Sequence, residues 1–157
     1  MKLTRVISLL MVLFLMGVPP HLVSAQSNTP GNCKTVGGSF IINLIDKTTG
    51  LGEVTGDLKG VVRGTILKAE PGSNKMQKLA LQHVIITDSG AVVTTADEAT
   101  LTPITNTTFF WQQSQSVTNA TGPYSDMTGT LDEIGVVDMA TGQGVLRYNG
   151  KLCNKSN

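Results

Sequence analysis

Aromatic residues, charged residues and cysteines are all scarce in this chain. Of its 157 residues 4% are aromatic and 15% are charged, and the formal net charge is +1. Nucleic-acid binding needs clustered lysine and arginine, often with stacking rings, so this composition argues against such a partner. Outside the first 25 residues the only histidine is His83, and no His/Cys/carboxylate spacing surrounds it. We therefore expect no transition-metal site.

Motifs that carry chemistry are also missing. The sequence contains no nucleophile elbow, no HExxH motif and no calcium-binding loop. The segment TGLGEVTG (Thr49–Gly56) is typical of turns rather than of nucleotide binding, because no helix follows it. We expect no cofactor, and no catalytic signature identifies the chain as an enzyme.

Only one long apolar run occurs, from Val6 to Val18. It follows Lys2 and Arg5 and precedes the small-residue end Val23-Ser24-Ala25. This order predicts a signal peptide over residues 1–25, cleaved after Ala25. The run is shorter than the roughly 20 residues that a membrane span needs. The sequence thus predicts a secreted or periplasmic protein without a membrane span.

The two cysteines, Cys33 and Cys153, lie near the two ends of the exported part. In an exported protein two cysteines usually pair. Closing so long a loop is worth roughly 4 to 5 kcal/mol in the chain-entropy model. A reactive thiol is the alternative, but it needs a thiolate-stabilising neighbour, and none is visible in the sequence. We expect a disulfide that brings the first and last strands together.

Between the cysteines the sequence predicts strands throughout. Each segment is rich in Val, Ile, Thr or aromatic residues and is bounded by turn residues, and no convincing 3.6-residue apolar period occurs. The motif D-x-x-T-G-x-G begins at Asp46 and again at Asp138. It predicts that one turn type is used twice. In each turn we expect the Asp to accept hydrogen bonds from backbone N–H groups and the first Gly to have a positive φ. The predicted strands are Val36–Ile45, Leu51–Asp57, Val61–Ala69, Met76–Thr87, Ala91–Leu101, Thr107–Val117, Tyr124–Leu131 and Gly144–Cys153.

Short connections between eight strands predict an all-β antiparallel meander, as an open sandwich or a closed barrel. A Cys33–Cys153 bridge joins the first strand to the last, which favours the eight-stranded barrel. We expect a lead-in over residues 26–35, the barrel over 36–153 and a tail over 154–157. A barrel of eight strands is filled by side chains or holds one small ligand.

Three segments carry a family resemblance. They are GSFIINLIDKTTGLGEVTGDLKGVVRGTI (Gly38–Ile66), DSGAVVTTADEATLTP (Asp88–Pro103) and YSDMTGTLDEIGVVDMATGQGVLRYNGKLC (Tyr124–Cys153). In layout and turn glycines the chain resembles the allene oxide cyclase/dirigent-like group of barrels. The resemblance implies a barrel cavity, with epoxide cyclisation or guided radical coupling as activities of that group. No catalytic run of the group can be matched to residues of this chain.

The candidate polar site residues are His83, Asp97 and Glu98. Histidine is the side chain whose unperturbed pKa lies near neutrality. The predicted strand places His83 on the same face as Leu79, Leu81 and Ile85. His83 is therefore either a pocket residue or a hydrogen-bonded or surface histidine. Asp97 and Glu98 are adjacent, so one of them should face inward. An inward acid could act as a general acid or base, or be satisfied by Thr hydroxyls or by the arginines Arg63 and Arg147.

Three of the six aromatic residues outside the signal segment stand in one run, Phe109-Phe110-Trp111. Alternation directs Phe109 and Trp111 to one side, as a core plug or as an apolar pocket or interface with Tyr124 as a polar partner. The following polar run, Gln112–Ser116, is typical of an exposed strand face, and Asp132-Glu133 of a solvated turn. Sequons place potential glycosylation at Asn106, Asn119 and Asn154.

Three functions remain open at this point. The first is binding of a small apolar ligand in the barrel interior or mouth, against His83, Phe109, Trp111, Tyr124, Asp97 and Glu98. The second is an enzyme of the cyclase or isomerase type that uses Asp97 or Glu98. The third is a structural or self-associating protein, a homo-oligomer with a filled barrel.

Overall fold

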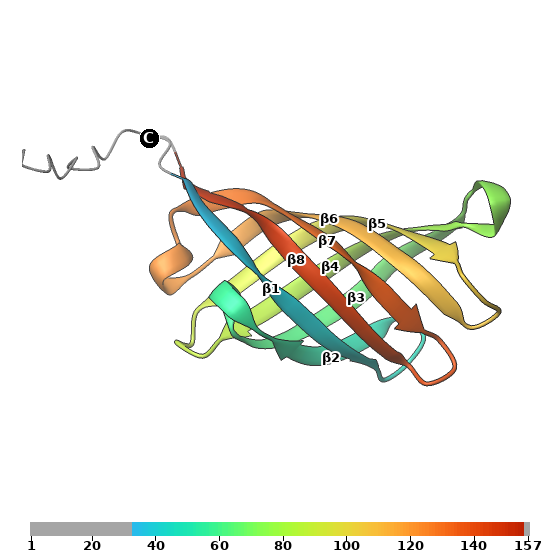
Figure 1. Ribbon diagram of the computed structural model, residues 1–157. Helices are drawn as coiled ribbons and strands as arrows, with labels where there is room; N and C mark the ends of the chain where they lie inside the picture. The colour runs from blue at the N-terminus through green and yellow to red at the C-terminus, as the bar shows by residue number, and fades with distance from the viewer. Residues whose placement is uncertain (1–32, 156–157) are drawn as a thin grey trace, which may run out of the picture.

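The computed structural model describes residues 33–155 and consists of one closed antiparallel barrel. Each strand pairs with the next one along the chain, and β8 pairs with β1 (Figure 1). Three single-turn 3₁₀ helices lie in the connections: η1 (Gly56–Leu58), η2 (Ser73–Lys75) and η3 (Gly122–Tyr124). The strands are β1 (Cys33–Leu44), β2 (Thr49–Val54), β3 (Gly60–Pro71), β4 (Gln77–Thr87), β5 (Val92–Pro103), β6 (Thr108–Ala120), β7 (Met127–Asp138) and β8 (Gln143–Asn154).

The structure confirms the predicted eight-stranded meander and its closure, but several strand ends differ. β2 ends at Val54, before the expected Asp57, β6 continues to Ala120, and β8 includes Asn154, which was expected in the tail. β1 begins at Cys33, inside the segment expected to precede the barrel. The seventh strand was expected to end at Leu131, but β7 continues to Asp138, and Tyr124 lies in η3 before it. The charged pair Asp132-Glu133 resembled a turn, although Glu133 shares the inward face of Leu131 and Val137 and only Asp132 is exposed. The predicted signal segment, residues 1–25, lies outside the described residues.

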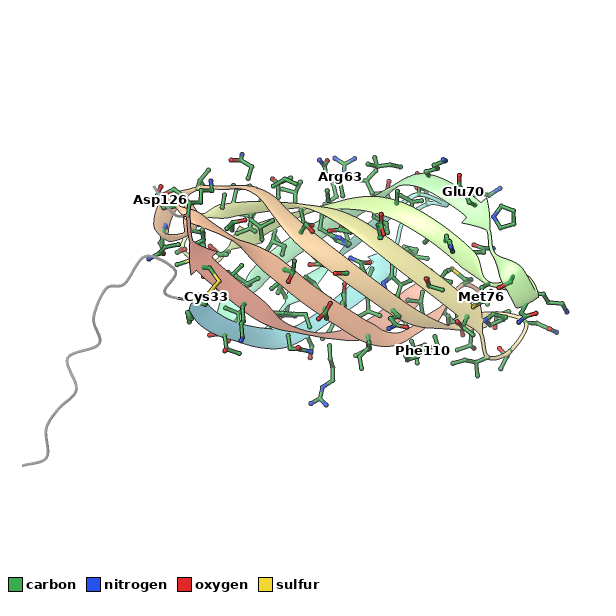
Figure 2. The ribbon with its side chains drawn as sticks, turned by 90° about the horizontal axis from the view of Figure 1, so that it is seen from above. Cys33, Arg63, Glu70, Met76, Phe110 and Asp126 are labelled. Carbon is green, nitrogen blue, oxygen red and sulfur yellow. A yellow bond between two sulfur atoms is a disulfide. The ribbon has the colours of Figure 1, made fainter. Side chains whose placement is uncertain are left out.

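The disulfide between Cys33 and Cys153 forms as expected and links β1 to β8. The two cysteines are directly opposite each other in the strand pairing, which runs on to Asn43 opposite Gln143. The bridge therefore fastens one end of the junction that closes the barrel. In Figure 2 the labelled Cys33 lies at the same end of the barrel as Asp126, far from Met76.

One end of the barrel is sealed from inside. The connections β2–β3, β4–β5 and β6–β7 lie at this end, and η1 places Leu58, which has no exposed surface, among the core side chains. The Tyr148 hydroxyl accepts a hydrogen bond from the Leu58 N–H at 3.0 Å and donates one to the Thr55 carbonyl at 2.9 Å. Burial raises the pKa of Tyr148. The turn is thus held in place by a residue of β8.

The opposite end carries the turns β1–β2, β3–β4, β5–β6 and β7–β8. The repeated motif forms two of them. The Asp46 carboxylate accepts the N–H groups of Thr48 and Thr49, each at 2.7 Å, and that of Asp138 accepts the Ala140 N–H at 2.8 Å. The expectation of a positive φ holds at the second turn alone, where Gly142 has φ 73°, because the corresponding glycine of the first turn is already part of β2. Leu44, Phe109 and Met139 at this end border a cavity of about 350 Å³, and we call this end the mouth of the barrel.

Candidate functional site

A chain of polar side chains crosses the barrel interior. His83 on β4 and Asp97 on β5 are both buried, and the His83 Nδ1 lies 2.6 Å from the Asp97 Oδ2. The Gln113 amide nitrogen on β6 lies 3.3 Å from the same Nδ1, and the Gln113 carbonyl oxygen accepts the Trp111 indole N–H at 2.8 Å. The strand alternation that buries Leu81 and Ile85 carries His83 inward between them.

A second buried pair adjoins this chain. The Gln115 amide nitrogen donates to the Glu133 carboxyl at 2.7 Å, and Gln115 is the cross-strand partner of Asp97. Burial, with a smaller contribution from the charge of Asp97, raises the pKa of Glu133 to about 7, although His83 and the Gln115 hydrogen bond act in the opposite direction. The barrel therefore holds two carboxyl groups and one imidazole in a low-dielectric interior.

Three polar atoms of this region are buried without a hydrogen-bond partner: the Thr95 hydroxyl, the second carboxyl oxygen of Asp97 and the Gln115 carbonyl oxygen. Leaving such groups unpaired costs free energy that an apolar side chain would not. The interior is therefore not optimised for packing alone, and polar groups of this kind are typical of sites that handle ligands or protons.

Two adjoining cavities lie between the mouth and the polar chain. The outer one, of about 350 Å³, is lined mainly by apolar groups, including Leu101, Phe109 and Met139 from three different connections or strand ends. The inner one, of about 40 Å³, reaches His83. The residues that line both cavities are Leu44, Thr48, Ile66 and Trp111. A ligand entering at the mouth would thus meet an apolar wall first and the imidazole last.

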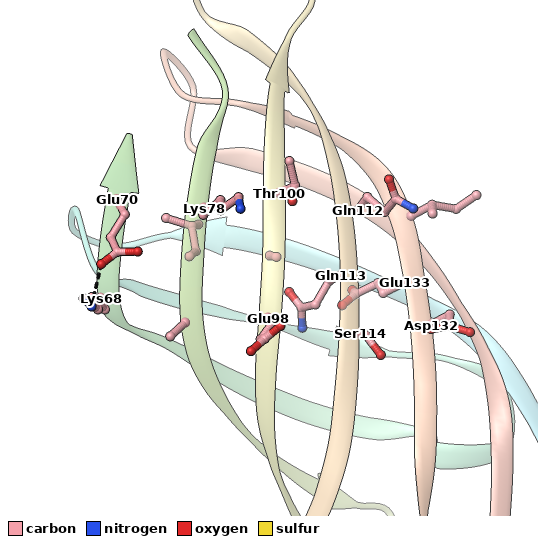
Figure 3. A pocket seen from close by; sticks show the side chains of 14 residues that line it. Lys68, Glu70, Lys78, Glu98, Thr100, Gln112, Gln113, Ser114, Asp132 and Glu133 are labelled. Atoms are coloured by element: carbon pink, nitrogen blue, oxygen red, sulfur yellow. Dashed lines mark ion pairs between the residues drawn. The ribbon is translucent and has the colours of Figure 1, made fainter. Parts of the chain in front are cut away.

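The largest hollow, of about 960 Å³, is on the outer wall over β3 to β7 (Figure 3). Its labelled side chains include the ion pair Lys68–Glu70 and the exposed Glu98 and Asp132. Among residues 33–155, the side chains that line this hollow carry charges of both signs and include no aromatic ring. The hollow also borders the buried Gln113 and Glu133. We place the candidate site in the smaller mouth, because the mouth is lined mainly by apolar groups and leads to His83, whereas exposed polar and charged side chains make up much of the outer hollow.

The predicted site residues separate into two groups. His83, Asp97, Trp111 and Phe109 lie in the interior or at the mouth, and Asp97 is the inward acid of its pair. Glu98 is on the outer wall, and Tyr124 lies at the sealed end, where its hydroxyl donates to the Asp57 carbonyl. Neither can therefore share a ligand with His83. The sequon residues Asn106, Asn119 and Asn154 are all exposed.

Sequence reasoning missed three interior residues. Gln113 and Gln115 were expected on an exposed face and Glu133 in a solvated turn, but all three are buried. Their polar partners are also not those expected, since Arg63 and Arg147 are exposed and the carboxyl groups pair with His83 and Gln115. The signal was the two-residue period, which places both glutamines on the same face as Trp111.

An apolar belt runs around the outer wall. We give this name to Ile41, Val145, Val136 and Phe110, which are exposed cross-strand neighbours in succession on β1, β8, β7 and β6. Exposed apolar rows of this kind occur at protein interfaces. The belt is the feature on which the predicted self-association depends, and self-association stays a prediction.

Comparison with family models, curated proteins and solved structures finds no match to this chain. Among residues 33–155, no group of three or more His, Cys, Asp or Glu side chains is arranged to hold a metal ion. Over the same residues no helix has the length and hydropathy needed to cross a membrane. The functional argument therefore depends on the interior of the barrel.

Proposed function

We propose that this chain is an exported binding protein that takes a small, mainly apolar molecule into the open mouth of its barrel. The observation that carries the proposal is the pair of adjoining cavities, which share Leu44, Thr48, Ile66 and Trp111 as lining residues, and of which the inner one reaches His83. Export is supported by the disulfide, since such bonds persist in oxidising compartments.

Binding would follow from the difference between the two ends of the barrel. Leu58 closes one end, so a ligand has its route at the mouth. There its apolar body would leave water for contact with Leu101, Phe109 and Met139, which is favourable in proportion to the apolar area buried. The strands that form the wall are held by the closed sheet, so little ordering is needed on binding.

Trp111 allows a direct test, because it is the only tryptophan in the sequence and it lines both cavities. Titration with octan-1-ol is expected to change its fluorescence saturably, and native mass spectrometry should show one bound molecule. Ile66→Glu places a charge in the mouth and should abolish binding. Val61→Glu, on the outer face of the same strand, is the matched control and should bind as the unmodified chain does.

Binding that is unchanged in Ile66→Glu would place the ligand elsewhere and overturn the site. No fluorescence change and no retained molecule, from octan-1-ol or from a lipophilic extract, would overturn the binding function itself.

A second candidate function is supported by the His83–Asp97 pair. A carboxylate hydrogen-bonded to one nitrogen of an imidazole orients the ring and supports its action as an acid or base. This arrangement favours an isomerase of the kind implied by the resemblance to the allene oxide cyclase/dirigent-like group. Such an enzyme would turn over a lipophilic substrate, and Asp97→Asn would abolish turnover while the substrate still binds. If the unmodified chain binds the substrate but does not turn it over, the isomerase is ruled out and the binding function stands.

A further inference from the structure

From the orientation of His83 we infer that the ligand carries a hydroxyl group on an apolar body, and that this hydroxyl binds the Nε2 of His83. The inference rests on the proposed function, since it names the chemistry of the molecule held in the mouth. It is carried by the hydrogen bonds of the ring, by the packing of the ring against Gly64 and by the residues that line the inner cavity.

The hydrogen bonds of the ring use one nitrogen only. The Nδ1 of His83 is 2.6 Å from the Asp97 carboxylate, which can only accept, so Nδ1 carries the hydrogen of this bond. The Trp111 indole N–H can only donate, which fixes the Gln113 carbonyl toward it and turns the Gln113 amide group toward Nδ1. Two donors cannot bond each other, so the 3.3 Å approach is a packing contact. Asp97 and Gln113 therefore hold the ring and leave Nε2 for a ligand.

The Nε2 side of the ring faces Gly64 of β3, the cross-strand neighbour of His83. A Cβ atom at Gly64 would lie 2.6 Å from Nε2, so any side chain there would displace the ring. Both residues line the inner cavity. The lack of a side chain at Gly64 therefore gives the ring its place against β3, and an atom that enters from the mouth would reach the ring through the inner cavity.

A hydroxyl is the group that suits this nitrogen in either protonation state. It donates to Nε2 when the imidazole is neutral and accepts from Nε2–H when the imidazole is charged, whereas a ketone oxygen can only accept. An anionic head is disfavoured at Nε2, because the Asp97 carboxylate is hydrogen-bonded to the same ring, whereas the two lysines of this region, Lys47 and Lys68, line the outer cavity and not the inner one. The remaining wall of the inner cavity is largely apolar and includes Ile42, Leu81 and Val137.

The test compares octan-1-ol, octan-2-one and octanoate on the full chain, with Trp111 fluorescence as the affinity readout. In the unmodified chain octan-1-ol is expected to bind about tenfold more tightly than octan-2-one, which is the effect of one hydrogen bond, and octanoate more weakly still. A ¹⁵N-edited spectrum of His83 should show a shift of Nε2, and not of Nδ1, when octan-1-ol binds.

Variants separate the anchor from general packing. His83→Phe should bind octan-1-ol and octan-2-one equally, and His83→Gln, which keeps a donor and an acceptor, should retain part of the preference if His83→Phe fails to fold. Gln82→Ala is the matched control, since Gln82 is the neighbour of His83 on β4 but faces outward and lines neither cavity. It should keep the full preference for the alcohol.

The outcomes distinguish the two proposals. Equal affinity for octan-1-ol and octan-2-one in the unmodified chain, or tightest binding of octanoate, overturns the hydroxyl anchor while the binding function stands. A preference for the alcohol that persists in His83→Phe also overturns it. If none of the three probes binds and the lipophilic extract also leaves no molecule bound, the proposed function itself fails.

Discussion

The buried carboxyl group of Glu133 should make the stability of the barrel depend on pH. The pKa of Glu133 is raised from 4.5 to about 7, first by burial and then by the charge of Asp97. Each tenfold change in acid strength is worth roughly 1.4 kcal/mol, so this corresponds to about 3 kcal/mol. The substitution that tests this is Glu133→Gln, which keeps the shape of the side chain and an oxygen that can accept the hydrogen bond from Gln115.

The sign follows from the protons bound in each state. The unfolded chain loses the Glu133 proton near pH 4.5, whereas the folded barrel keeps it until about pH 7. Between these values the folded state binds more protons, so the contribution of Glu133 is fully present below pH 4.5 and is lost as the pH rises through 7. Above pH 7 the unmodified chain carries the whole cost of an ionised, buried carboxylate.

Urea unfolding of the unmodified chain and of Glu133→Gln at pH 4, 6 and 8 measures this contribution. The stability of the variant relative to the unmodified chain should increase by about 3 kcal/mol between pH 4 and pH 8. Asp132→Asn, one residue away on the outer wall, is the matched control and should not reproduce the increase. A difference between Glu133→Gln and the unmodified chain that stays constant from pH 4 to pH 8 would refute the reasoning.

Two further predictions concern the closure of the barrel. Replacing both cysteines, Cys33→Ser with Cys153→Ser, removes a bridge between residues 120 positions apart. The free energy of unfolding measured in urea should fall by about 4 to 5 kcal/mol. An unchanged midpoint of urea unfolding would show that strand pairing alone sets the stability. Leu58→Ala should cost about 3 kcal/mol by leaving a cavity at the sealed end. Leu67→Ala, at an exposed position, should cost less than about 0.5 kcal/mol in the same assay, and an equal loss in both variants would contradict the role of Leu58 as a plug.

The fold could be predicted because its determinants are local and repetitive. Turn residues separate segments rich in β-branched side chains, and the two cysteines identify which strands meet. The sequence pattern also predicted correctly that His83 shares the inward face of Leu81 and Ile85 and that one of Asp97 and Glu98 faces inward. Ala99 and Leu101, two and four residues beyond Asp97, are buried, so Asp97 is the acid that faces inward.

The interior polar residues could not be predicted from the same pattern. An alternation rule assigns polar side chains to water, so Gln113, Gln115 and Glu133 were placed outside even though they share the parity of buried neighbours. Glu133 reaches Gln115 from the next strand and His83 approaches Gln113 from β4, so these contacts form only when the strands assemble. Tyr124 illustrates the opposite error, because its place at the sealed end depends on η3, a turn that strand propensity does not reveal.

The pairing of β1 with β8 also bears on how the chain folds. β1 finds β2 through a short turn, but its second edge stays open until the last strand of the barrel is available. Contacts so distant in sequence make folding slow, and an unpaired strand edge is a template for pairing with other chains. The formation of the Cys33–Cys153 bond then holds the last-formed ladder together, so the oxidised chain is expected to be protected from strand exchange at the junction where it would otherwise open first.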